Sequence, residues 1–159
     1  MSPDDLLPVL AMALLAGLNG RMACRRVLFL LPAAWVLGGL AGFAARTQLV
    51  PEVATAVSLL ALGALTAADL RLSTAVVSGL AVALGLLHGW LNGSGIATAG
   101  REALGLAGIA AATFVLVALF SALVVALRAP WTRIVVRVAG SWFAAIGLLM
   151  LGWSLRPGS

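Results

Sequence analysis

Residues 104–127 read LGLAGIAAATFVLVALFSALVVAL, a stretch without a single charged side chain. A helix needs about 20 predominantly apolar residues to cross the hydrocarbon core of a bilayer, so this stretch is long enough to span it. A transmembrane β-strand would alternate polar and apolar residues with a period of two, and this stretch shows no such alternation. The stretch therefore predicts a transmembrane helix.

The rest of the chain has the same character. Of its 159 residues, 63% are hydrophobic and only 9% are charged, whereas soluble domains carry roughly 25% charged residues. A small water-soluble fold has too little interior to hide this much apolar surface, and helices and closed barrels are the forms that span lipid. We therefore expect an all-α integral membrane protein with a single transmembrane domain over residues 1–159.

Apolar runs separated by short polar segments predict a bundle of six transmembrane helices. They cover approximately residues 3–18, 27–45, 53–70, 73–91, 102–127 and 132–155. The longest polar stretch between them is Asn92–Arg101, which is rich in Gly, Ser and Thr. Met1–Asp5 carries two acids where a signal peptide has basic residues, so we expect the first apolar run to be retained as a helix.

The arginines predict how the bundle lies in the membrane. With six spans and an outside N-terminus, the inner segments hold seven of the ten basic residues, Arg21, Arg25, Arg26, Arg71, Arg128, Arg133 and Arg137, and the outer segments hold Arg46, Arg101 and Arg156. Basic residues concentrate in cytoplasmic loops. The pattern predicts a multi-pass protein with both termini outside, and it explains the net charge of +5 without a nucleic-acid partner.

Glycines recur at four-residue spacing in two of the predicted helices. Gly38 and Gly42 lie in the second helix, and Gly85, Gly89 and Gly93 lie along the fourth. Within lipid, small residues at this spacing let two helix backbones approach closely. We predict that these five glycines are helix-packing residues.

The polar residues near membrane depth predict one candidate metal site. His88, the only histidine, shares a helix face with Asn92, and the predicted topology brings that end of the fourth helix to the membrane face where Asp4 and Asp5 begin the first. Oxygen and nitrogen donors of this kind bind divalent transition metals. The alternative interpretation is a packed, hydrogen-bonded His88, with Asn92 and Gly93 capping the helix.

Three segments carry a resemblance to a known family: LLPVLAMALLAGLNGRMACRRVLFLLP at 6–32, LLALGALTAADLRLSTAVVSGLAVALGLLHGWLNG at 59–93, and RVAGSWFAAIGLLML at 137–151. Over almost its whole length, about residues 3–155, the chain resembles the HupE/UreJ family of bacterial membrane proteins, which are linked to nickel supply for hydrogenases and ureases. The resemblance implies a six-helix bundle in the bacterial inner membrane and the permeation of Ni²⁺ or Co²⁺.

The resemblance also assigns candidate metal ligands, and this chain has fewer of them than the family pattern has. Asp4 matches the aspartate of an Asp-His pair in the family's first helix, and Asp5 stands where the histidine of that pair is expected. His88 and Gly89 match the first of two His-Gly pairs in the fourth helix. Asn92-Gly93 replaces the second pair, and Gly95 stands where the family has an acid.

Two functions follow from these observations. The first is a nickel or cobalt permease with a reduced site at Asp4, Asp5, His88 and Asn92. The second is a non-transporting accessory or structural subunit, which would pack its small-residue faces against a larger membrane complex or another copy of itself. We do not expect an enzyme, because the chain has too few buried acids, bases and nucleophiles for a catalytic cluster.

Overall fold

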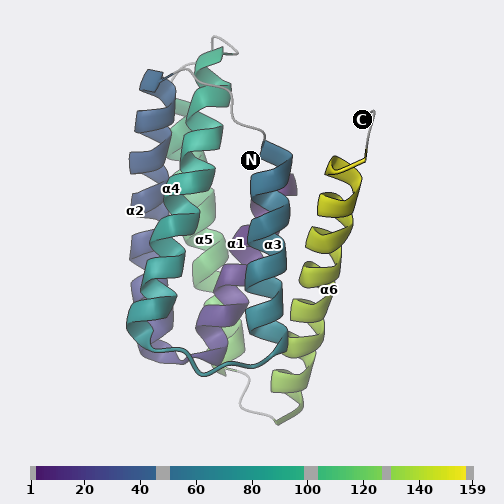
Figure 1. The fold of residues 1–159 in the computed structure, drawn as a ribbon. Coiled ribbons are helices and arrows are strands. Elements are labelled where there is room, and N and C mark those ends of the chain that lie inside the picture. Colours follow the sequence, from purple (N-terminus) through teal and green to yellow (C-terminus); the bar gives the residue numbers. More distant parts are fainter. Residues whose placement is uncertain (1–2, 46–50, 99–103, 127–129, 157–159) are drawn as a thin grey trace.

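The described part of the chain is all-helical, as predicted. A computed structural model describes residues 3–45, 51–98, 104–126 and 130–156, and these residues form six helices and no strand. The helices are α1 (Pro3–Leu18), α2 (Arg21–Ala45), α3 (Pro51–Ala67), α4 (Thr74–Thr98), α5 (Leu104–Ala126) and α6 (Pro130–Ser154). Figure 1 shows them standing side by side as a bundle.

Among the described residues, three helices are long and apolar enough to cross a membrane: Arg21–Ala45, Thr74–Ala97 and Trp131–Ser154. Asp5–Leu18, Glu52–Ala67 and Ala111–Phe120 are shorter apolar helical segments. These segments and the apolar composition make the chain a membrane protein. Whether all six helices cross the bilayer stays a prediction.

Two helix boundaries differ from the predicted ones in a way that bears on function. Helix α2 begins at Arg21, before the predicted start at Val27, because arginine is a good helix former and an apolar run does not mark where a helix begins. Helix α4 continues to Thr98, past the predicted end at Leu91. Asn92 and Gly93 are therefore interior helical residues, and the interpretation of these two as a helix cap does not hold.

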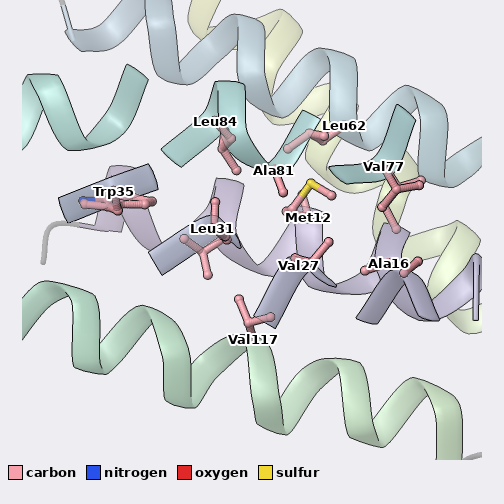
Figure 2. Packing of buried hydrophobic residues seen from close by; sticks show 14 residues of the cluster. Met12, Ala16, Val27, Leu31, Trp35, Leu62, Val77, Ala81, Leu84 and Val117 are labelled. Carbon is pink, nitrogen blue, oxygen red and sulfur yellow. The ribbon is translucent and has the colours of Figure 1, made fainter. Parts of the chain in front are cut away.

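Helix α1 is the centre of the bundle. It contacts each of the other described helices, and Val9, Met12 and Leu15 on it are fully buried. The buried cluster around it draws side chains from α1 to α5, including Trp35 and Leu31 of α2, as Figure 2 shows. Lipid tails are as apolar as these side chains, so the cluster is held together by close packing and dispersion.

Glycines bring α2 and α4 into backbone contact. A Cβ on Gly89 would collide with the carbonyl oxygen of Trp35, and a Cβ on Gly42 would collide with that of Trp90. Gly38, Gly85 and Gly93 lie at the same contact. All five glycines singled out in the sequence thus lie where two backbones touch.

A second close contact joins α3 to α6, and the sequence reasoning missed it. Gly63 of α3 lies against the backbone of Gly140 and Ala144, and Gly147 lies against Ala56 and Leu60. The glycines here are not spaced by four residues within one helix, so the pattern that identified the α2–α4 contact gave no signal.

Hydrogen bonds join the turn after α3 to the first turns of α6. Asp69 has a φ of 54°, in the left-handed region that aspartate and asparagine tolerate. Arg133 Nε donates to Asp69 Oδ2 at 2.6 Å, and Arg137 Nε donates to the carbonyl oxygen of Ala67 at 3.1 Å. The hydrogen bond from Arg133 holds the pKa of Asp69 below its ordinary 3.8, with Arg137 and Arg71 adding to the effect.

Gly89→Ala should destabilise the bundle by about 1–3 kcal/mol, because the new methyl group must push two helix backbones apart. Gly79→Ala is the matched control on the same helix, since a Cβ there meets nothing within 4 Å. It should leave stability unchanged or raise it slightly, as alanine is the better helix former. Unfolding of the purified protein in mild detergent, followed by tryptophan fluorescence, measures both. Equal effects of the two changes would contradict the close contact.

Asp69→Asn should remove the ion pair while keeping a residue that tolerates the left-handed turn. The pair is partly exposed, so its contribution is about 1 kcal/mol or less. Because the pKa of Asp69 is lowered in the folded protein, this contribution is present at neutral pH and is lost as the pH falls below 3.8 through the folded pKa. The stability difference between wild type and variant should therefore shrink on acidification. A pH-independent difference would refute this assignment.

Candidate functional site

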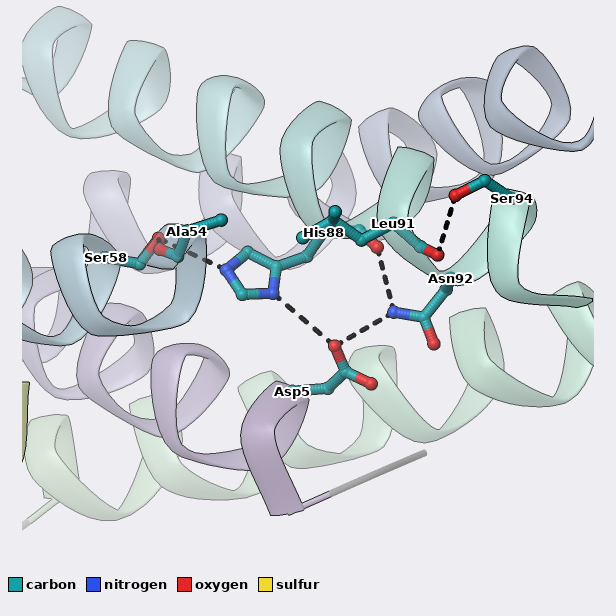
Figure 3. A network of polar contacts seen from close by, with 7 residues as sticks. All are labelled: Asp5, Ala54, Ser58, His88, Leu91, Asn92 and Ser94. Atoms are coloured by element: carbon teal, nitrogen blue, oxygen red, sulfur yellow. Dashed lines mark hydrogen bonds and ion pairs between the residues drawn. The ribbon is translucent and has the colours of Figure 1, made fainter. Parts of the chain in front are cut away.

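Three helices bring four polar side chains together inside the bundle. Asp5 comes from the first turns of α1, Ser58 from α3, and His88 and Asn92 from α4 (Figure 3). His88 is fully buried, and Asp5 and Ser58 are 5% and 8% exposed. An acid and an imidazole removed from solvent in an apolar bundle are costly, so they are retained only with partners.

The carboxylate of Asp5 is the hub of the cluster. Its Oδ1 accepts a hydrogen bond from Asn92 Nδ2 at 2.9 Å and lies 3.5 Å from His88 Nδ1. The same Asn92 amide donates to the carbonyl oxygen of His88 at 2.8 Å. Asn92 is thereby fixed between its own helix and α1, which explains why a polar side chain is kept inside α4.

The hydrogen bonds of Ser58 favour the tautomer of His88 that carries its proton on Nε2. Its hydroxyl has one proton and donates it to the carbonyl oxygen of Ala54 at 2.8 Å. The Nε2 of His88, 3.2 Å from Ser58 Oγ, is then the donor to that oxygen. In a neutral ring Nδ1 consequently presents a lone pair to Asp5 Oδ1. Two such atoms repel each other unless a proton or a metal ion lies between them.

Trp35 forms an apolar wall beside the cluster. Its ring centroid lies 5.6 Å from that of His88, with the two planes tilted by 34°, and its side chain is fully buried. The backbone oxygen of Trp35 is also the atom that a Cβ on Gly89 would meet. The close α2–α4 contact therefore places this indole against the imidazole and restricts how the ring can turn.

The structure brings together three of the four residues predicted as metal ligands, Asp5, His88 and Asn92. The side chain of Asp4 lies outside the described residues. Within the described part of the chain, no group of three or more His, Cys, Asp or Glu side chains could hold a metal ion. Sequence reasoning missed Ser58, because a serine in an apolar run gives no signal until the helix that carries it is placed beside His88.

Comparison with known proteins identifies the family. The family model described as HupE / UreJ protein matches residues 1–150, which is nearly the whole chain. The chain belongs to the HupE/UreJ family. The resemblance seen in the sequence is thereby confirmed. The comparison found no match among curated proteins and none among solved structures.

Membership of the HupE/UreJ family narrows the class of function. It makes this chain a membrane protein of a family related to nickel and cobalt transport, and the family is not a known enzyme family. In this HupE/UreJ protein, Asn92 stands where the resemblance predicts a second histidine. The structure puts its amide on the carboxylate of Asp5, so Asn92 orients the acid.

Ser58→Ala should cost about 1–3 kcal/mol of stability, because it leaves the buried N–H of His88 without an acceptor. Ser78→Ala is the matched control: Ser78 also donates to the carbonyl four residues earlier, at 2.7 Å, but it does not contact His88. Parallel unfolding measurements in mild detergent isolate the His88 contact as the difference between the variants. If both variants lose the same stability, Nε2 is not the donor to Ser58.

Proposed function

We propose that this protein moves Ni²⁺ or Co²⁺ across the bacterial inner membrane, and that Asp5, His88, Asn92 and Ser58 form the place where the ion binds. The observation that carries the proposal is the spacing of Asp5 Oδ1 and His88 Nδ1, which lie 3.5 Å apart. Family membership supports the choice of cargo.

The spacing suits a shared ion better than a direct ion pair. Charge-assisted N–H···O bonds are usually about 2.7–2.9 Å long. Two donors bound to one ion through bonds of about 2.1 Å lie about 3.0 Å apart at a right angle and about 3.4 Å apart at a tetrahedral angle. An ion could therefore bridge the nitrogen and the oxygen without a large movement of either helix.

The remaining polar groups support the same role. A histidine that binds a metal usually donates its other ring N–H to an oxygen atom, which fixes the ring, and Ser58 offers that oxygen to Nε2. Asn92 steadies the carboxylate of Asp5. With one imidazole and one carboxylate as the charged or basic donors, water would complete the coordination shell. Such a site would hold an ion weakly enough to release it.

The proposal includes six membrane crossings with both termini outside. The arginines support it, because the turns after α1 and α3 and the start of α6 lie at one end of the bundle, and Arg21, Arg71 and Arg133 belong to this end. Helix α1, with 16 residues, is about 24 Å long, shorter than the hydrocarbon core of roughly 30 Å. It is enclosed by other helices, so its length need not match the lipid.

A non-transporting accessory subunit is the second candidate function. The observation that favours it is the small ligand set: within the described residues the cluster has one carboxylate and one imidazole, and Asn92 and Ser58 already engage both. Under this proposal the cluster only locks α1 to α3 and α4. The unpartnered faces would then contact a larger membrane complex or a second copy.

His88→Ala should reduce the uptake of radioactive nickel by cells that express the protein at least tenfold, because the only imidazole is lost. Asp69→Asn, which changes an acid outside the cluster, is the control and should leave uptake at the wild-type level. Equal expression of each variant in the membrane is verified by immunoblot. Cobalt should compete with nickel better than magnesium does, since nitrogen donors favour the later transition metals.

Unchanged uptake in the His88→Ala cells would remove His88 from the ion path. If wild-type expression does not raise uptake at all, the accessory function becomes the better proposal. Purification in a gentle detergent followed by mass spectrometry then tests it directly. A stoichiometric partner would support it, whereas a clean monomer or homo-oligomer would count against a larger complex.

A further inference from the structure

The first turns of α2 carry an unfavourable concentration of positive charge. Arg21, Arg25 and Arg26 lie at the N-terminus of the helix, and no acidic residue lies in its first turn. The positive end of the helix dipole repels cations there, and Arg21 and Arg25, spaced i and i+4, repel each other. Asp69 pairs with Arg133, and Asp5 lies beside His88, so neither contact includes any of these three arginines.

Two grooves run along either side of this arginine-bearing segment. One, of about 440 Å³, lies between α2 and α5 and is lined by Arg21, Arg25 and Leu28 of α2 and by Val117, Ala118 and Ala122 of α5, together with Cys24. The other, of about 560 Å³, is lined by Met22, Arg25, Arg26, Phe29, Leu30 and Ser78. Both volumes fall in the range of roughly 300–1,000 Å³ that ligand clefts have.

Arg25 lines both grooves, and the residues of α2 that line each groove change from arginines to apolar residues along the helix. The arginines lie at the start of α2, whereas Leu28 in one groove and Phe29 and Leu30 in the other lie further along the helix. From Arg21 to Leu28 the helix rises by about 10 Å. Arginines therefore border both grooves at the end of the bundle, the lining of the α2–α5 groove itself is almost wholly apolar, and Ser78 adds a polar group to the other groove.

We propose that this segment of α2 binds an anionic phospholipid, with the phosphate on Arg25 and its neighbours and one acyl chain in each groove. A guanidinium binds phosphate oxygens in a bidentate manner. A lipid with two chains matches two apolar grooves that meet at one cation. The bound phosphate also relieves the charge repulsion at the helix start.

The position of the segment fits this occupant. The α2 start lies beside the turn between α3 and α4, since Asn19 in the preceding turn accepts a hydrogen bond from Leu72 N at 2.8 Å. Arg71 is therefore near the same end, and in the proposed topology this end faces the cytoplasmic leaflet, where basic residues meet anionic headgroups. A second copy of this face would bring arginine against arginine, so self-association through it is disfavoured. The lipid site itself does not depend on metal transport.

The test measures the thermal unfolding temperature of the purified full chain in neutral detergent while phosphatidylglycerol is added. Phosphatidylglycerol should raise the unfolding temperature of the wild type more than phosphatidylcholine does, and glycerol 3-phosphate should not raise it. Arg25→Gln should weaken the apparent affinity for phosphatidylglycerol about fivefold, which corresponds to about 1 kcal/mol. Arg25→Lys keeps the charge and should weaken it less.

Arg71→Gln is the matched control, because it removes the same charge at the same end of the bundle but lies outside both grooves. It should leave the response to phosphatidylglycerol intact. The proposal is overturned if phosphatidylcholine acts equally, if glycerol 3-phosphate alone reproduces the effect, or if Arg71→Gln weakens binding as much as Arg25→Gln does. If Arg25→Gln does not fold, Arg21→Gln in the same groove replaces it.

Discussion

The backbone contact between α2 and α4 is the constraint on which the rest of this structure depends. Lipid removes the hydrophobic driving force between helices, so stability must come from the number of atoms in close contact. Glycines allow this close contact because they lack a Cβ, so that the backbone at Gly89 lies against the carbonyl of Trp35. Once α4 is fixed on α2, the rotation of α4 about its own axis is fixed as well. The glycines then face α2, while His88 and Asn92 contact Asp5 on α1.

The rotation of α4 determines which polar side chains meet in the cluster of Asp5, Ser58, His88 and Asn92. A buried carboxylate and imidazole would each be very unfavourable alone, and each is retained because the other helices supply partners. Ser58 accepts from one ring nitrogen and leaves the other facing Asp5. Under the proposed function, a metal ion would bind at this pair of donor atoms, Asp5 Oδ1 and His88 Nδ1, which lie 3.5 Å apart. The proposed movement of nickel or cobalt rests on these two atoms, and membership of the HupE/UreJ family supports the choice of these ions.

The two ends of the bundle carry different chemistry. The cluster of Asp5 and His88 lies where α1 begins, whereas the arginines of α2 and the Asp69–Arg133 pair lie where α1, α3 and α5 end. An ion that reached His88 from the end where α1 begins would therefore enter away from Arg21, Arg25 and Arg26 of α2. The proposed lipid on Arg25 would neutralise part of the positive charge at the other end.

The sequence by itself determined the helical class, the membrane environment, the approximate helix count and the glycines at the α2–α4 contact. These properties follow from local composition and spacing, and an uninterrupted apolar run such as residues 104–127 has few other solutions in lipid. It also singled out His88, Asp5 and Asn92, because polar residues in such a chain are rare.

Only the tertiary structure decided what these residues do to one another. Three features depend on how distant segments pack. They are the extension of α4 through Asn92 to Thr98, the contact of Ser58 on α3 with His88, and the α3–α6 glycine contact. The reason is physical: helix spacing fixes which residues share a face, but the neighbour that a face meets is set by long-range packing. A proton assignment on His88 needs that neighbour, and no pattern within one helix contains it.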